Sequence, residues 1–309
     1  MKLCTFFLAI TLLLLPPSQG LASQLICGLA YGNQTLPALP EFTAESDRSQ
    51  YYGCEYLNQP QARTGNWLPD WPEFSYWQHQ SNGFPPQGNP DNKGYQLQAD
   101  IPLKRLDTST LFFHYQQTQW QQLLNTTETI NYQPANGAAI ELSDGQITAV
   151  ELRQSEFGLA LRMPYRSNHP ITEVKLSKLN QQHPLQANIL NQPLRTLYAA
   201  ETDFWQLSIA SDSYHRGLNI NWQVGFGQGK VAFGDEASLQ VLENEDELIA
   251  IKGRLDFFYR WRMNMRWHTY MAWQNRILHW QQVSSNDNLQ LPAANQYESR
   301  LNVGILLRF

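Results

Sequence analysis

The last ten residues of the chain, Arg300-Leu-Asn-Val-Gly-Ile-Leu-Leu-Arg-Phe309, decide how the rest of the sequence is interpreted. Side chains two apart in an extended strand point to the same side, so this stretch has two distinct faces. One face carries Leu301, Val303, Ile305, Leu307 and Phe309, and the other carries Arg300, Asn302, Gly304, Leu306 and Arg308. The pattern predicts a strand with one face in hydrocarbon and the other in polar surroundings.

A strand of this kind, ending the chain on an aromatic residue, resembles the closing strand and export signal of Gram-negative outer-membrane barrels. The resemblance implies an all-β, antiparallel transmembrane barrel located in the bacterial outer membrane. A secreted soluble β-sandwich would show a similar mean hydropathy, so that alternative stays open at this point.

Composition narrows the class of protein. The 309 residues carry a net charge of −5, which excludes the strongly basic surface of a nucleic-acid-binding protein. Aromatic residues make up 12% of the chain and include ten Trp, although the mean hydropathy is negative. A barrel explains both values, because half of each strand faces lipid, half faces a polar lumen, and aromatic residues mark the interfaces.

The N-terminal segment has two expected parts. Residues 1–22 combine Lys2, an apolar run and a small-residue site ending at Ala22, which predicts a cleaved signal peptide. After them, no apolar run approaches the roughly 18 residues of a spanning helix. Residues 23–71 are rich in proline, and we expect a periplasmic extension tied by a disulfide between Cys27 and Cys54.

Residues 72–309 are expected to form the barrel. Alternating segments recur there, and Ile249 to Trp261 is the clearest, with seven apolar or small residues on one face and charges between them. About ten strands, or ten to twelve, are predicted, separated by connections that alternate between short and long. With the C-terminus in the periplasm, the short turns are periplasmic and the long loops extracellular.

The expected inward face of these strands mixes positive and negative residues. A narrow barrel filled with charges that pair is expected to be closed rather than a diffusion pore. The inward set comprises Arg162, Glu173, Lys175, Lys252, Arg254, Asp256, Arg260, Arg266, His268 and Arg300.

One segment carries candidate catalytic chemistry. His79 and Ser81 are two apart on a predicted strand and so share a face. A His next to a Ser is the minimum for an activated hydroxyl nucleophile, in which the imidazole takes the proton as the oxygen attacks an acyl carbon. Asn82, Asn89, Asp91 and Asn92 are the nearby polar residues that could orient the imidazole.

This segment also carries a family resemblance. The stretch Glu73-Phe-Ser-Tyr-Trp-Gln-His-Gln-Ser-Asn-Gly83 resembles the His-x-Ser-Asn-Gly segment of the outer membrane phospholipase A family, and Asn92-Lys-Gly-Tyr95 resembles its Asn-x-x-Tyr. The resemblance implies an acyl ester hydrolase on membrane lipids, with Ser81 as nucleophile, His79 as base and Asn92 as the orienting residue. It also implies calcium as a cofactor and a homodimer.

A second hypothesis is a non-enzymatic barrel with a closed lumen. Its role would be structural, adhesive or binding, through the long extracellular loops. The acidic run from Glu243 to Glu247 lies in such a loop and could bind divalent cations, but a solvated loop is the simpler interpretation. Asp212-Ser-Tyr-His215 pairs an acid with a His at an expected periplasmic turn, and Gly225-Phe-Gly-Gln-Gly229 lacks the helix and Lys/Ser pair of a phosphate loop.

Overall fold

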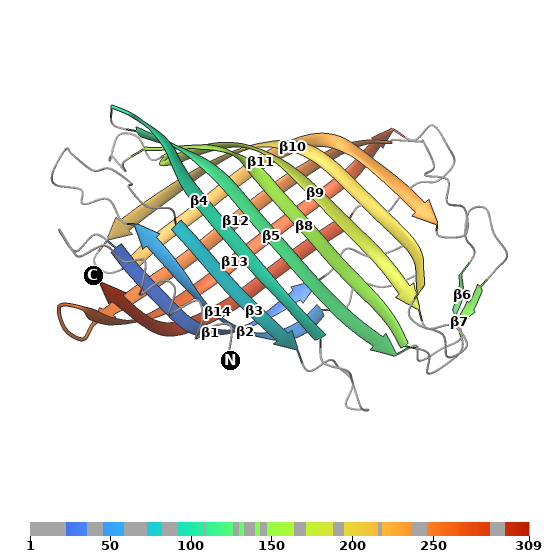
Figure 1. Cartoon of the computed structure of the whole chain (residues 1–309), viewed down its shortest axis with the longest axis horizontal. Helices are drawn as coiled ribbons and strands as arrows, with labels where there is room; N and C mark the ends of the chain where they lie inside the picture. Colours follow the sequence, from blue (N-terminus) through green and yellow to red (C-terminus); the bar gives the residue numbers. More distant parts are fainter. Residues whose placement is uncertain are drawn as a thin grey trace.

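The computed structural model shows a closed antiparallel barrel (Figure 1). It describes residues 23–35, 46–58, 73–81, 92–107, 109–125, 130–132, 140–142, 147–163, 171–187, 195–215, 218–235, 246–284 and 294–308. Within these ranges twelve strands form the barrel in the order β1-β14-β13-β12-β11-β10-β9-β8-β5-β4-β3-β2. Two further short strands, β6 and β7, pair with each other between β5 and β8.

The strand bounds follow the alternation of the sequence but are wider than expected. The strands are β1 Ser23–Thr35, β2 Ser46–Asn58, β3 Glu73–Ser81, β4 Asn92–Leu106, β5 Ser109–Asn125, β6 Ile130–Tyr132, β7 Ile140–Leu142, β8 Ile147–Arg162, β9 Glu173–Ala187, β10 Arg195–His215, β11 Leu218–Asp235, β12 Asp246–Arg262, β13 Trp267–Ser284 and β14 Ala294–Arg308. Within the described residues, no helix is long and apolar enough to cross a membrane.

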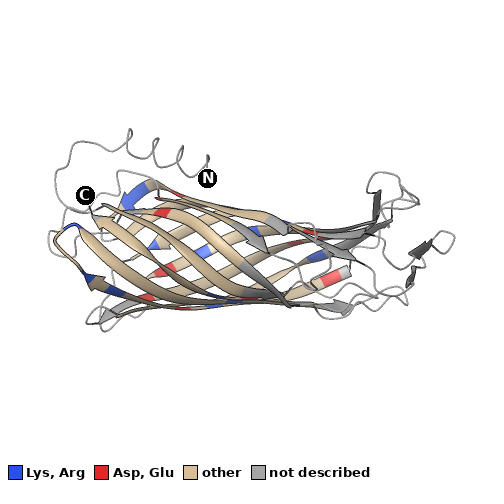
Figure 2. Cartoon of the chain, turned by 90° about the horizontal axis from the view of Figure 1, so that it is seen from below, with Lys and Arg blue, Asp and Glu red and all other residues tan. Residues whose placement is uncertain are grey.

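The barrel has two ends that differ in their connections. The turn end holds the β12–β13 turn, residues 263–266, and the C-terminal end of β14; the loop end holds the β5–β8 connection. Figure 2 marks where the charged residues of the strands lie along the barrel between these two ends.

The prediction of an N-terminal periplasmic extension over residues 23–71 requires a correction. Most of residues 23–71 does not lie outside the barrel, because β1 pairs with β14 and with β2, and so closes the ring. These two strands raise the count from about ten to twelve. The soluble β-sandwich is excluded by the same closed order of strands.

The reason for the error lies in the lumen faces of β1 and β2. Gly28, Ala30 and Gly32 face inward on β1, and Tyr51 and Gly53 face inward on β2. Apart from Glu55, which contacts Trp77 in the lumen, the described inward side chains of β1 and β2 are uncharged. The contrast between faces that revealed the other strands is therefore missing, although the backbone alternates in the same way.

The outer wall carries an apolar belt, which fits a barrel that spans a lipid bilayer. Exposed large apolar side chains occupy every second position on neighbouring strands. On β12, β13 and β14 they include Ile249, Ile251, Leu255, Trp261, Trp267, Met271, Trp273, Leu301, Val303 and Ile305. A water-exposed wall with this many aligned apolar residues would be a large aggregation-prone surface.

Toward the loop end the outer wall becomes polar. Lys178 on β9 forms an ion pair with Asp203 on β10, with 2.8 Å between Nζ and Oδ2. On β8, the Nε of Arg153 lies 2.8 Å from the Oε1 of Glu151. Outward charges of this kind mark the upper limit of the apolar belt, so the strands continue beyond the hydrocarbon. A tilted strand needs about ten residues to cross the bilayer, and the extension beyond the hydrocarbon explains why β10 has 21.

The expected disulfide is confirmed. Cys27 and Cys54 are directly opposed in the β1–β2 ladder, with their Cα atoms 4.1 Å apart. They lie on the outward face, next to a row of lumen-facing glycines formed by Gly304, Gly28 and Gly53 on three adjacent strands. Large side chains from other strands cover this row: a Cβ at Gly28 would overlap the Tyr270 hydroxyl.

Candidate functional site

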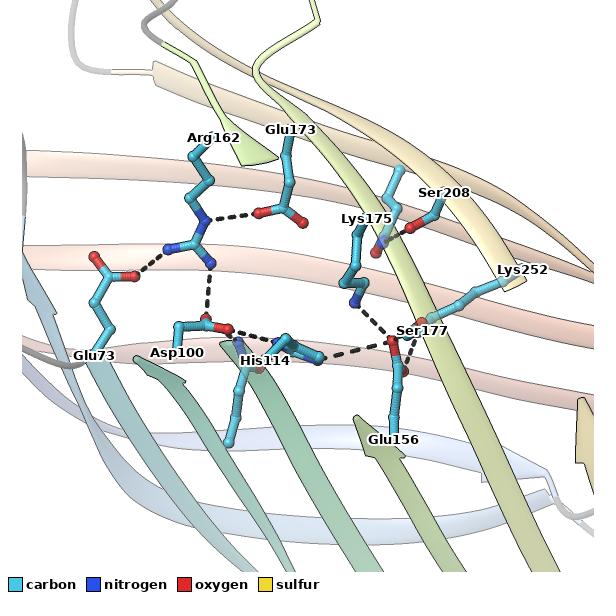
Figure 3. A network of polar contacts seen from close by, with 12 residues as sticks. Glu73, Asp100, His114, Glu156, Arg162, Glu173, Lys175, Ser177, Ser208 and Lys252 are labelled. Atoms are coloured by element: carbon cyan, nitrogen blue, oxygen red, sulfur yellow. Dashed lines mark hydrogen bonds and ion pairs between the residues drawn. The ribbon is translucent and has the colours of Figure 1, made fainter. Parts of the chain in front are cut away.

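A network of ion pairs crosses the lumen, and it is the densest group of charged side chains that the described residues show (Figure 3). Its first centre is Arg162, the last residue of β8, whose guanidinium contacts three carboxylates from three other strands. Nη1 lies 2.6 Å from Glu73, Nη2 2.8 Å from Asp100, and Nε 2.7 Å from Glu173. The guanidinium also stacks 4.5 Å from the centre of the Phe112 ring.

The second centre is Glu156 on β8, whose side chain is fully buried. Its Oε1 accepts hydrogen bonds from the Nζ of Lys175 at 2.7 Å and the Oγ of Ser177 at 2.9 Å. Its Oε2 accepts from the Nζ of Lys252 at 2.7 Å. Because a buried carboxylate is stable only when it is paired and hydrogen-bonded, this set of donors is what allows Glu156 to sit in the lumen.

The contact between Glu156 and Lys252 joins distant parts of the wall. Three strands, β9, β10 and β11, separate β8 from β12 in the ring. A direct 2.7 Å contact between side chains of β8 and β12 therefore crosses the lumen. Open diffusion along the barrel axis is obstructed at this level.

His114 on β5 connects the two centres. Its Nδ1 lies 2.6 Å from Asp100 Oδ1, and its Nε2 lies 3.8 Å from Glu156 Oε1. The imidazole is buried, and both ring nitrogens face carboxylate oxygens. The two charge clusters are thus linked into one network that extends from β3 to β12.

A second obstruction lies closer to the loop end. The Nε2 of Gln181 on β9 donates to Gln296 on β14 at 3.2 Å, although four strands lie between β9 and β14. Buried apolar side chains pack in the same half of the lumen: Leu179, Phe204, Leu248, Ala250, Leu278 and Trp280. Side chains of non-neighbouring strands therefore meet at more than one level of the lumen, and its closure to solutes stays a prediction.

The part of the wall formed by β14, β1, β2 and β3 contains a further buried arginine. Arg300 on β14 is buried, with its guanidinium 5.0 Å from the Trp77 ring centre and 5.4 Å from that of Tyr51. The Trp77 indole in turn donates to Glu55 at 2.8 Å. These contacts brace β14 against β2 and β3 across the closing strand β1.

The predicted inward set is mostly placed as expected, with one correction. Arg162, Glu173, Lys175, Lys252 and Arg300 take part in the lumen contacts above. Arg266, in contrast, lies in the β12–β13 turn and is exposed. The strand before it ends at Arg262, so the alternation does not extend through Arg266.

The predicted catalytic residues come together in the backbone pairing of β3 and β4. Ser81 is paired directly with Asn92, and His79 with Gly94. The side chains of His79, Ser81 and Asn92 are outside the described part of the structure, so their catalytic role stays a prediction. By strand alternation these positions have the parity of Glu73 and Trp77, which contact lumen partners.

The remaining candidates are resolved only in part. His215 is the last residue of β10 at the turn end, and its side chain, like residues 243–245, lies outside the described part. Gly225, Gly227 and Gly229 lie within strand β11, which excludes a phosphate loop leading into a helix. Among the described residues no group of three or more His, Cys, Asp or Glu is arranged to hold a metal, and calcium stays a prediction from the family resemblance.

Sequence reasoning missed the centre of the network. Glu156 and His114 lie in alternating segments, on the face opposite Phe157 and Phe113, but neither was among the predicted inward residues. Nothing local shows that a lysine nearly a hundred residues away pairs with Glu156. Gln181 lies inside β9, and nothing in the sequence around it shows that it contacts Gln296.

The fold defines a closed antiparallel β-barrel of transmembrane type, with ion pairs and hydrogen bonds between non-neighbouring strands in its lumen. No family model matches the chain, and no curated protein matches it. Solved structures similar to it include the toluene transporter TodX of Pseudomonas putida, at 9% identity and a TM-score of 0.34, with 95% of this chain and 90% of that chain covered.

Two others are the outer membrane protease OmpT of Escherichia coli and a FadL homologue of Pseudomonas aeruginosa. The protease has 10% identity, coverage of 94% and 99%, and a TM-score of 0.31. The FadL homologue has 8% identity, coverage of 93% and 90%, and a TM-score of 0.32. Likeness at this level assigns no activity to the chain.

Proposed function

We propose that the protein is an outer-membrane barrel with a closed lumen that acts through the connections at its loop end, in a binding, adhesive or structural role. The contact between Glu156 and Lys252 carries this proposal, because it crosses the lumen between strands that are not neighbours. A barrel of this kind has no continuous polar path for solutes and offers its function at its ends.

The placement in the outer membrane is supported by the apolar belt together with the expected signal peptide and terminal strand. At the turn end, β4 and β5 are joined through residues 107–108 and β10 and β11 through 216–217. Two other connections at that end are longer, residues 59–72 between β2 and β3 and residues 163–172 between β8 and β9. At the loop end every connection is longer than these tight turns, including residues 36–45 and 126–146. Short periplasmic turns and long extracellular loops are the usual arrangement in outer-membrane barrels.

Single-channel recording in planar bilayers tests the closed lumen. The refolded protein is expected to give no stable conductance steps, while a general diffusion porin in the same bilayer gives large ones. Stable steps of porin size from the wild-type protein would overturn the proposal.

Labelling of single cysteines on intact cells tests the orientation of the barrel. Glu247→Cys, at the loop end, should react with a membrane-impermeant maleimide, and Asn264→Cys, at the turn end, should not.

The acyl hydrolase remains the second candidate, and one observation favours it. The pairing of Ser81 with Asn92 puts the proposed nucleophile directly opposite the proposed orienting residue, with His79 two residues away. Outer-membrane phospholipid would be the substrate, with calcium as cofactor and a homodimer as the active form.

A fatty-acid release assay separates the two candidates. Under the hydrolase hypothesis, refolded protein in detergent with calcium releases fatty acid from phospholipid, and Ser81→Ala abolishes the release. Under the closed-barrel proposal neither protein releases it. Equal release by wild type and Ser81→Ala would remove Ser81 from any catalytic role.

A further inference from the structure

The β12–β13 turn has an unusual sequence and an unusual surface. Trp261-Arg-Met-Asn-Met-Arg-Trp267 reads the same in both directions. All seven residues are exposed, and the apolar ones strongly so: Met263 is 69% exposed, Met265 75%, Trp261 46% and Trp267 44%. Large apolar side chains held this far out in water at a turn need an explanation.

The turn is rigidly built, so this exposure is a property of its conformation. The side-chain Oδ1 of Asn264 accepts hydrogen bonds from the backbone N–H groups of Arg266 at 2.9 Å and Trp267 at 2.8 Å. The N–H groups of Met263 and Asn264 both donate to the carbonyl of Trp267 at 3.1 Å. These bonds close the turn through its backbone, and both methionine side chains stay exposed.

Both charged residues of the turn are arginines. Arg262 and Arg266 are exposed, and neither guanidinium has a hydrogen-bond or ion-pair partner among the described residues. From Phe257 to Asn275 the sequence contains no Asp or Glu, in a chain whose net charge is −5. Two unpaired guanidinium groups therefore flank the exposed methionines.

We propose that this turn is a binding site for the phosphate headgroup of an anionic phospholipid in the leaflet at the turn end. Trp261 and Trp267 end the outward apolar faces of β12 and β13, so the turn continues directly from the lipid-facing belt. Trp prefers the membrane interface, and an arginine there reaches lipid phosphate with a planar set of donors. Met263 and Met265 insert between the acyl chains beside that headgroup.

The β4–β5 turn at the same end provides a contrast. It also exposes apolar residues, Leu103 and Leu106, but it contains an acid, Asp107. The Nε of Arg105 donates to the backbone carbonyl of Asp107 at 3.3 Å, so this arginine is engaged within its own turn. The two arginines without partners among the described residues therefore distinguish the β12–β13 turn from the β4–β5 turn, where Lys104 is exposed but Arg105 is engaged.

Lipid retention measured by native mass spectrometry tests the site. The full chain, refolded in detergent, is supplied with equal amounts of phosphatidylglycerol and phosphatidylcholine, and the bound lipids are counted. Wild-type protein should retain phosphatidylglycerol preferentially. The double variant Arg262→Gln/Arg266→Gln should lower this preference about thirtyfold, because each of the two basic residues near an anionic surface contributes about 1 kcal/mol. The control is Lys230→Gln, which removes one positive charge from an exposed position of β11. This variant should keep the preference for phosphatidylglycerol.

Two outcomes would overturn the proposal. One is equal retention of both lipids by the wild-type protein; the other is an unchanged preference in the double arginine variant, with folding checked by its β-sheet circular dichroism. Competition with inorganic phosphate at matched ionic strength identifies the source of the ligand. A site for free phosphate would release the lipid, whereas a lipid site anchored by the methionines would not. The proposal rests on the barrel spanning a bilayer and not on the closed lumen or the hydrolase hypothesis.

Discussion

Glu156 shows how a single residue organises the lumen. Its two carboxylate oxygens accept hydrogen bonds from lysines of β9 and β12, and Ser177, which lies diagonally across the β8–β9 ladder, donates the third. Removing a fully buried partner of this kind leaves the remaining charges without compensation. The cost is then larger than the net value of the ion pairs themselves.

We therefore expect Glu156→Gln to lower the free energy of unfolding by about 3–5 kcal/mol, since Lys175 and Lys252 would be left buried and unneutralised. Urea unfolding in lipid vesicles, followed by tryptophan fluorescence, measures the change. Glu201→Gln is the matched control, because Glu201 is exposed and accepts one hydrogen bond from Asn180. A loss below about 1 kcal/mol for Glu156→Gln would show that the lumen around it is well hydrated.

The space around Gly28, rather than any charge, limits which side chain this position can hold. A Cβ at this position would overlap both the hydroxyl of Tyr270 and the carbonyl oxygen of Val303, and the latter belongs to the backbone of β14. Gly28→Val is expected to destabilise the closing seam by about 1–3 kcal/mol or to prevent closure. The fraction that keeps the compact, heat-modifiable form in gel electrophoresis reports this. Leu29→Val, at the adjacent outward position, should fold normally, and equal folding of both variants would contradict the crowding.

At the scale of elements, the first hairpin is the part of the barrel fastened by a covalent bond. The disulfide joins β1 to β2, and β1 in turn pairs with the last strand, so the staple lies next to the seam that closes the ring. It restricts the conformations of the unfolded chain between Cys27 and Cys54, and it holds β1 and β2 in register.

Cys27→Ser/Cys54→Ser should lower the free energy of unfolding by about 2–4 kcal/mol. Comparing urea unfolding of wild type with and without a reducing agent measures the same quantity independently. The reducing agent should leave the double serine variant unchanged. If it shifts that variant as well, the effect of the reducing agent does not come from this disulfide.

The strands differ in how far sequence predicted them. β12 was predicted from Ile249 to Trp261, because its charged inward face contrasts with its apolar outward face, and the structure extends it by a few residues. β1 and β2 were missed because glycines and buried aromatics on their inward faces remove that contrast. The candidate triad of β3 and β4 was predicted from local motifs, and the structure adds the direct pairing of Ser81 with Asn92.

At the scale of the whole molecule, the apolar belt predicts a dependence on membrane depth. Val303→Arg, at an exposed position within the belt, should cost about 2–4 kcal/mol of folding free energy in phosphatidylcholine vesicles. Gln281→Arg, exposed near the loop end of β13, should cost about 1 kcal/mol or less. Equal costs at the two positions would mean that the outer wall does not lie in lipid as described.

The sequence by itself determined the local properties of this protein: extended strands with two faces, an aromatic and apolar outer wall, charges inside, and two cysteines able to pair. Alternation is a property of neighbouring residues, so it can be read along the chain. Only the tertiary structure decided the number of strands, the closure of β1 on β14, and the contact of Glu156 with Lys252 across the lumen. These depend on the register between distant strands and on the curvature of the ring, and both arise only when the whole sheet closes.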